Sequence, residues 1–166
     1  MNVIDIFEAI QKRRSIRTYQ DEPVEEDKLH QLLEAARLAP SAKNRQNWKF
    51  IVVRDKHIRE QLAHACNEQK FIAEAPVVIA GVADPTLKWY KIDMGIAVEH
   101  IALEAMKLDL GTCWIGAFDE REVSRILKVP DNLETVILIT VGYPRIIPPR
   151  TPRKDMDDIV RYDSLS

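Results

Sequence analysis

The sequence predicts an α+β fold in one domain, for three reasons. Segments with helical spacing of apolar residues are mixed with short apolar runs typical of strands, and the two kinds do not alternate strictly. A chain of 166 residues that is 46% hydrophobic can bury one sizeable core. From Pro144 to Pro152 the chain has four prolines, and apolar periodicity ends there, so residues 145–166 should form an extended arm.

Two amphipathic helices are expected in the first forty residues. Asn2 should cap the first, which ends near Arg13 and has apolar residues at Val3, Ile6, Phe7 and Ile10. The second follows a turn at Pro23 and is stopped by Pro40. Its apolar stripe is Leu29, Leu32, Leu33 and Ala36.

Residues 47–53, NWKFIVV, predict a strand, and residues 55–66 predict a helix opened by Asp55. The apolar run at 76–83 predicts a buried strand.

A long helix is expected from Lys91 to Leu110, with Gly111 at the cap position. It should be buried on more than one side, in the core or against a partner subunit, because apolar residues cover most of its circumference. These residues are Met94, Ile96, Val98, Ile101, Leu103, Ala105, Met106 and Leu108.

The last elements follow in short order. Residues 111–118, GTCWIGAF, predict a strand or extended loop. Asp119 and Glu122 have the spacing of a capping box ahead of a helix at 123–129. Residues 134–144, ETVILITVGYP, give the clearest strand pattern.

Composition excludes several classes of function. Lys and Arg number 24 against 26 Asp and Glu, and this balance argues against a nucleic-acid binder. The two cysteines and four histidines lack metal-ligand spacing, so we expect no metal site and a reducing, cytoplasmic location. The apolar runs are too short to span a membrane, and the N-terminus shows no targeting pattern.

The arginine-rich stretch RRSIR, residues 13–17, is the first functional signal. In an extended chain Arg13, Ser15 and Arg17 project to one side, which would suit an anion. The chain has no GxGxxG or GxxxxGK[ST] motif, so side chains would have to bind any phosphate, as arginine does well. The alternative is a set of surface ion pairs with Glu22, Glu25 and Glu26.

Two further stretches are unusual. APSAKNRQNWKF, residues 39–50, sets polar side chains in a loop that could contact a heterocycle, although ordinary turn chemistry would also explain them. GTCWIGAF places small residues beside Trp114, as a close approach to a flat ligand requires. Cys113 fits a small buried hydrophobe better than a nucleophile.

Together RRSIR, APSAKNRQNWKF, DMGIAVEHIALEAMKLDLGTCWIGAF and PRKDMDDIV resemble, in order and spacing, the nitroreductase family of FMN-dependent oxidoreductases. The resemblance implies a central mixed or antiparallel sheet flanked by helices and an intertwined homodimer with FMN at its interface. It also implies one domain over residues 1–166, whose arm at 145–166 contacts the partner subunit.

The resemblance also implies site residues. Those matching the family's FMN-binding segments are Arg13, Arg14, Ser15, Arg17, Pro40, Ser41, Asn44, Trp114, Ile115, Gly116 and Arg153. Arg17 would approach the pyrimidine edge of the flavin, Arg153 would bind the phosphate, and Pro40 to Asn44 would reach across the interface. Asn47 stands where the family usually has proline.

The implied activity is transfer of hydride from NAD(P)H through bound FMN to a small conjugated acceptor such as a nitroaromatic or quinone. No catalytic side chain need be prominent, because the flavin performs the chemistry. Two alternatives remain open at this stage: a flavin-binding or phosphate-binding module without turnover, and a structural dimer whose arginines make only ion pairs.

Overall fold

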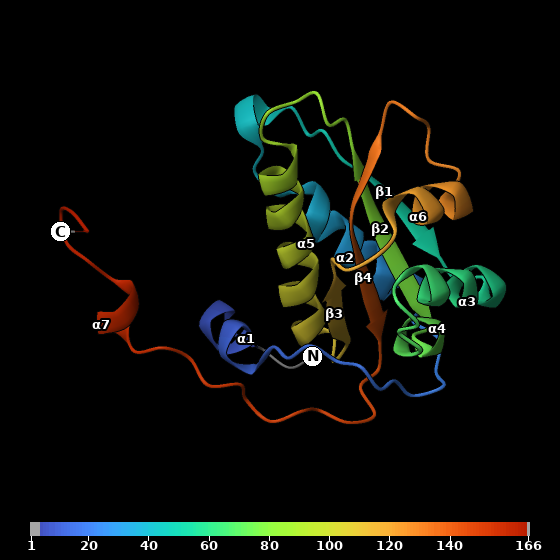
Figure 1. Cartoon of the computed structure of the whole chain (residues 1–166). Coiled ribbons are helices and arrows are strands. Elements are labelled where there is room, and N and C mark those ends of the chain that lie inside the picture. The colour runs from blue at the N-terminus through green and yellow to red at the C-terminus, as the bar shows by residue number, and fades with distance from the viewer. Residues whose placement is uncertain (1–3, 166) are drawn as a thin grey trace.

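Four antiparallel strands form the centre of the computed structural model, which describes residues 4–165 (Figure 1). Their order is β1-β2-β4-β3. The strands are β1 (Lys49–Val53), β2 (Val77–Ala83), β3 (Gly111–Ile115) and β4 (Glu134–Gly142). The prediction of an α+β fold with a central sheet is confirmed.

Helices cover both faces of the sheet, as Figure 1 shows. One face packs against α2 (Glu26–Arg37) and α5 (Tyr90–Lys107). The other packs against α3 (Lys56–Ala65), α4 (Phe71–Glu74) and α6 (Glu120–Leu127).

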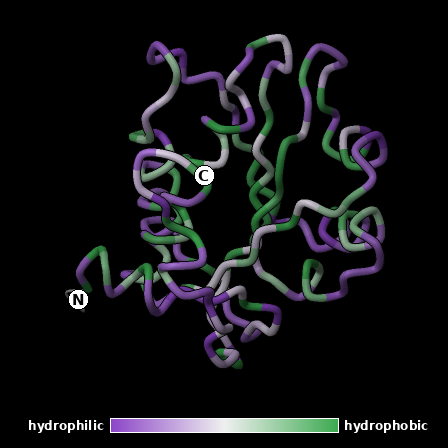
Figure 2. The backbone as a smooth tube through the Cα atoms, turned by 60° about the vertical axis from the view of Figure 1, so that its left-hand side comes forward, coloured by the Kyte–Doolittle hydropathy of each residue, from purple (hydrophilic) through white to green (hydrophobic). Residues whose placement is uncertain are grey.

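Strand β2 contributes to both cores. Val77 and Ile79 belong to the core under α2 and α5, whereas Val78 and Ala80 belong to the other. Alternate residues of a strand point to opposite faces, so a strand covered on both sides needs apolar residues at every position. The central strands form the most continuous hydrophobic stretch of the backbone in Figure 2.

The first helix, α1, spans Ile6–Lys12 and has Asp5 as its cap, whose carboxylate accepts the backbone N–H of Glu8 at 2.7 Å. The predicted cap Asn2 lies outside the described residues. The large apolar side chains of α1 do not reach the core: Ile6, Phe7 and Ile10 are 77%, 66% and 53% exposed, whereas Ala9 is buried.

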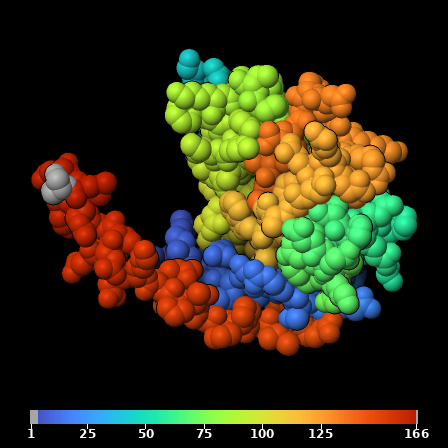
Figure 3. Space-filling model, in the orientation of Figure 1, coloured from blue at the N-terminus to red at the C-terminus, as the bar shows by residue number. Residues whose placement is uncertain are grey.

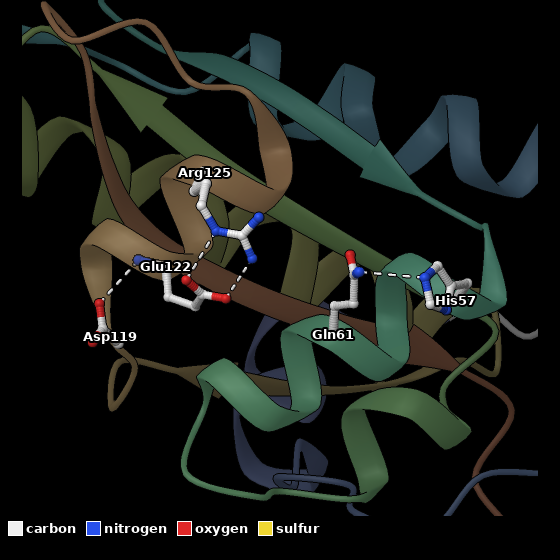
Figure 4. Close-up of polar contacts among 5 residues, drawn as sticks. All are labelled: His57, Gln61, Asp119, Glu122 and Arg125. Carbon is white, nitrogen blue, oxygen red and sulfur yellow. Dashed lines mark hydrogen bonds and ion pairs between the residues drawn. The ribbon is translucent and has the colours of Figure 1, made fainter.

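Capping was predicted correctly for α3, where Asp55 accepts the N–H of Ile58 at 2.9 Å. At α6, Asp119 accepts the N–H of Glu122, but the Glu122 side chain pairs with Arg125 instead of completing the capping box (Figure 4). Figure 4 also shows Gln61 beside His57 on the exposed surface of α3.

The predicted end of the long helix was wrong. Helix α5 ends at Lys107, Asp109 takes the left-handed turn conformation (φ 60°), and Gly111 begins β3. Glycine is needed at 111 because of a close approach. A Cβ atom there would lie 2.5 Å from Cγ1 of Ile16 and 2.8 Å from Cγ of Pro144.

We expect Gly111→Ala to lower the free energy of unfolding by roughly 1 to 3 kcal/mol, the usual cost of overpacking. Urea denaturation of purified protein would measure it. Gly116→Ala is the control, because its Cβ would meet only Cδ1 of Ile137 at 3.8 Å. Equal stability of the Gly111 variant and wild type would contradict the expectation.

Three short elements were not expected from the sequence: α4, the 3₁₀ turn η1 (Ala42–Asn44) and α7 (Met156–Ile159). Each has at most four residues, too few to show helical periodicity.

The arm after Pro144 is extended up to the short helix α7, and most of it is exposed. Arg145 anchors its start, with its backbone N–H donating to the Thr18 carbonyl at 3.0 Å. The arm then passes α1, and its end with α7 stands away from the body (Figures 1 and 3). Its apolar side chains are more than 60% exposed at Met156, Ile159, Tyr162 and Leu165. Within residues 4–165, no helix combines the length and apolarity needed to cross a bilayer.

Candidate functional site

Residues 15–20 are held against the ends of β3 and β4. The N–H of Ile16 donates to the Thr112 carbonyl at 2.9 Å, and the N–H of Gln20 donates to the Tyr143 carbonyl at 2.9 Å. The Tyr19 hydroxyl donates to the Ile16 carbonyl at 2.8 Å and lies 2.6 Å from the hydroxyl of Thr140. Burial raises the pKa of Tyr19 well above its usual range, so it remains a neutral anchor.

The alternation predicted for RRSIR is present for Ser15, Ile16 and Arg17, but Arg14, which was expected on the side opposite Arg13, lines the same cavity as Arg13. Ile16 is buried with Tyr19 and Ala75, whereas Arg13, Ser15 and Arg17 line a surface cavity of about 550 Å³. Arg14 also borders this cavity, and its guanidinium donates to the carbonyls of Gln11 and Arg13 at the end of α1. Arginine is favourable there because a helix ends in unpaired carbonyls and negative partial charge.

The cavity lies between α1, residues 13–17, α5 and the arm. Its charged lining residues are five arginines and one glutamate: Arg13, Arg14, Arg17, Arg150, Arg153 and Glu99. Such a concentration of positive charge is unexpected in a chain with a net charge of -2. It favours a multiply charged anionic ligand.

The alternative of surface ion pairs is not what the structure shows. Glu26 pairs with Arg54, and Glu25 accepts the hydroxyl of Tyr143 and lies 3.6 Å from Nζ of Lys28. Within the described residues, the ion pair formed by RRSIR joins Arg13 to Glu99, with 3.6 Å between Nε and Oε1.

Glu99 lies on α5 and was not predicted from the sequence. Burial raises the pKa of its half-buried carboxyl, while Arg13, Trp114 and His100 each lower it in part. Trp114 lowers this pKa as a hydrogen-bond donor, and the indole N–H is the donor that its side chain offers. Glu99 therefore connects the arginine segment to the GTCWIGAF segment.

The three predicted residues of that segment differ in orientation. The Trp114 side chain is 36% exposed and lies beside α5, 4.0 Å from where a Cβ on Gly95 would be. Ile115 is buried in the core beneath α3 and α6, so only its backbone could face a ligand. Gly116 is exposed.

Pro40 and Ser41 lie elsewhere. They line an open hollow of about 330 Å³ at the N-terminal end of α5, together with Ala42, Trp89, Ile92, Asp93 and Ile96. The buried Asp93 carboxylate accepts the backbone N–H of Ala42 at 3.1 Å and so ties this loop to α5. One chain therefore does not bring the second predicted segment to the arginine cavity.

The loop itself has an unusual backbone. Lys43, Asn44 and Gln46 have φ between 51° and 54°, a left-handed conformation that is costly for residues other than glycine. Ser41 Oγ accepts the N–H of Gln46 at 2.9 Å, which is the turn chemistry weighed above. Strain of this kind often accompanies a functional loop.

Asn47, the departure from the family pattern, has a structural role. Its amide donates to the Asp84 carbonyl at 3.1 Å and accepts the Asp84 N–H at 3.2 Å. A proline could make neither side-chain contact.

Neither cysteine has the properties of a nucleophile. Cys113 is buried, and burial raises the pKa of its thiol, as it raises that of Cys66 to about 12. A thiol held protonated is a poor nucleophile. No cluster of three metal-ligating side chains occurs in the part of the chain that the structure describes.

Comparison with known proteins adds independent information. The profile of the nitroreductase family matches residues 10–84 and 63–143. A nitroreductase family protein from Clostridium novyi NT is 36% identical, with a TM-score of 0.82 over 86% of this chain and 88% of that one. An FMN-dependent nitroreductase from Clostridium difficile is 32% identical, with a TM-score of 0.85 over 95% and 98%. An FMN reductase (NAD(P)H) of Bacillus subtilis is 29% identical over 90% of this chain and 70% of its own.

Proposed function

This chain belongs to the nitroreductase family, and from that premise we propose that it is an FMN-dependent oxidoreductase using NAD(P)H. Bound FMN would supply the redox chemistry, taking hydride from NAD(P)H and passing it to a small conjugated acceptor such as a nitroaromatic or quinone. The observation that carries the proposal is the cavity in which two distant segments, 13–17 and 150–153, place five arginines.

The residues of the cavity fit a flavin phosphate. A phosphate dianion needs several charge-assisted hydrogen bonds, and arginine can offer paired donors to it. Arg13 and Arg153 would bind the phosphate with the Ser15 hydroxyl, and Arg17 would lie nearer the ring. The Arg153 side chain is exposed, and its guanidinium donates to the Thr151 and Pro152 carbonyls of its own segment, so its side chain is accessible to a ligand.

The ring would lie toward Trp114 and the backbone of Ile115 and Gly116. Backbone N–H groups in such a segment can donate to a heterocycle without adding charge. Arg17 would favour the reduced form of the cofactor, because a cation stabilises the negative charge that develops on reduction.

We further propose a homodimer in which the second segment reaches the partner's cavity. Asp93 and Glu99 are six residues apart on α5, about 9 Å along its axis. Antiparallel packing of two copies of α5 would bring Pro40, Ser41 and Asn44 of one subunit toward the arginines of the other. The exposed Ile92 on α5 and the exposed side chains of α1 give such a partner an apolar surface.

Residues 1–166 would then act as a single domain, with 145–166 lying on the partner. A flavin-binding module without turnover remains the second candidate, because the cavity accounts for binding and does not by itself require catalysis.

The test uses purified full-length protein. We expect yellow protein with bound FMN, whose absorbance is bleached by NADH or NADPH and restored by a nitroaromatic or quinone. Bound FMN that NAD(P)H does not reduce would favour the binding module. Protein that neither contains nor takes up FMN would overturn both.

A further inference from the structure

Glu99 is an acidic residue in a cavity whose other charged residues favour anions. It is the one acid among the charged residues that line the cavity, together with five arginines. A surface acid on α5 could have paired with a lysine, as Glu104 does with Lys107 at 3.0 Å. Glu99 instead lies in the cavity lining and pairs with Arg13, and Trp114 lowers the pKa of its carboxyl as a hydrogen-bond donor.

Its contacts leave Arg13 able to bind a ligand. The ion pair uses Nε of Arg13 at 3.6 Å, so the four N–H groups of the two terminal nitrogens are not engaged by Glu99. The Arg13 side chain is only 24% exposed, and its ion pair therefore restricts the direction of the guanidinium. Trp114, which is not among the residues that line the cavity, also acts on the Glu99 carboxyl as a hydrogen-bond donor that lowers its pKa.

The carboxylate has a second, opposing effect. A phosphate bound by Arg13 would lie close to Glu99, and two negative groups in a half-buried site repel each other. A ligand without phosphate would not experience this repulsion. The charge of Glu99 thus weakens the binding of phosphorylated ligands in particular. Its contacts with neighbouring side chains affect the binding of every ligand.

We propose that Glu99 is a positioning residue that also sets how strongly the cavity prefers a phosphorylated flavin over an unphosphorylated one. Its carboxyl orients Arg13 and Trp114, and its charge limits affinity for the phosphate dianion. This inference rests on the proposed function and extends it to the control of ligand preference.

The experiment compares FMN with riboflavin, which lacks the phosphate. Full-length protein freed of flavin is titrated with each, as wild type, Glu99→Gln and Glu99→Ala. Removing the charge should increase the ratio of the riboflavin dissociation constant to that of FMN about tenfold in both variants. Glu104→Gln, which removes a carboxylate from the same helix outside the cavity, should leave the ratio unchanged.

Trp114 fluorescence tests the positioning role without flavin. Gln keeps an oxygen for the indole and Ala does not, so only Glu99→Ala should change the emission and its quenching by iodide. Trp114→Phe, alone and combined with Glu99→Ala, assigns the change to Trp114 among the three tryptophans.

The outcomes are separable. A ratio within twofold of wild type in Glu99→Gln would overturn the control of preference, and identical Trp114 emission in the Gln and Ala variants would overturn the positioning. Wild-type protein that binds neither flavin would overturn the proposed function and this preference together. The titration of wild-type protein alone would reveal that outcome.

Discussion

Arg13→Ala and Arg153→Ala should each weaken FMN binding by about ten- to a hundredfold. A hydrogen bond between a charged donor and phosphate contributes roughly 1.5 to 3 kcal/mol, which corresponds to that range of affinity. The two side chains approach the cavity from opposite ends of the sequence, so similar losses would show that both segments bind one group. Titration of flavin-free protein with FMN measures the loss.

Arg125→Ala is the matched control. This arginine forms a bidentate pair with Glu122 on the surface of α6, remote from the cavity lining. Exposed pairs contribute roughly 0 to 1 kcal/mol, and removal of this one should leave FMN affinity unchanged. If the Arg13 and Arg153 variants bind FMN within twofold of wild type, RRSIR is ordinary surface charge.

The arrangement of residues 13–17 could be predicted because its signal is local. In an extended strand, alternation alone separates Ile16 from Arg13, Ser15 and Arg17, and the structure needs only a buried neighbour for Ile16 to realise it. The strands could also be predicted, because an apolar run such as residues 76–83 leaves no polar face for solvent.

Glu99 could not be predicted in this way. On a helix that is apolar around most of its circumference, one acid resembles a solvated surface residue, and its partners are 86 residues earlier and 15 residues later. The end of the long helix was predicted wrongly from Gly111 for a related reason. The position of this glycine after a helix indicates a cap, whereas the requirement for glycine comes from Ile16 and Pro144, which only the tertiary fold brings near.

The separation of Pro40 and Ser41 from the arginines could not be predicted, again because it depends on the tertiary fold. A sequence pattern shows which segments belong to a site but not whether one chain can assemble it. Here the loop is tied to the N-terminal end of α5 by Asp93. We propose that a second copy of the chain completes the site.

A chain truncated after Pro149 should lose both dimerisation and FMN binding. Truncation removes Arg150 and Arg153 from the cavity, and two charge-assisted contacts together correspond to a loss of more than about a hundredfold in affinity. It also removes Met156, Ile159, Tyr162 and Leu165, which are exposed in the single chain and would be buried on a partner. Light scattering and FMN titration measure the two effects.

The two losses can be separated with Met156→Ser/Ile159→Ser, which keeps every arginine of the cavity and removes apolar surface from the arm. This variant should weaken the dimer, and it should weaken FMN binding only at protein concentrations where the dimer dissociates, because the partner's loop then leaves the site. Concentration-independent FMN affinity across the dimer–monomer transition would refute a shared site. A truncated chain that stays dimeric with full flavin content would refute a role for the arm. The apolar side chains of the arm would then not be needed to hold the partner subunit.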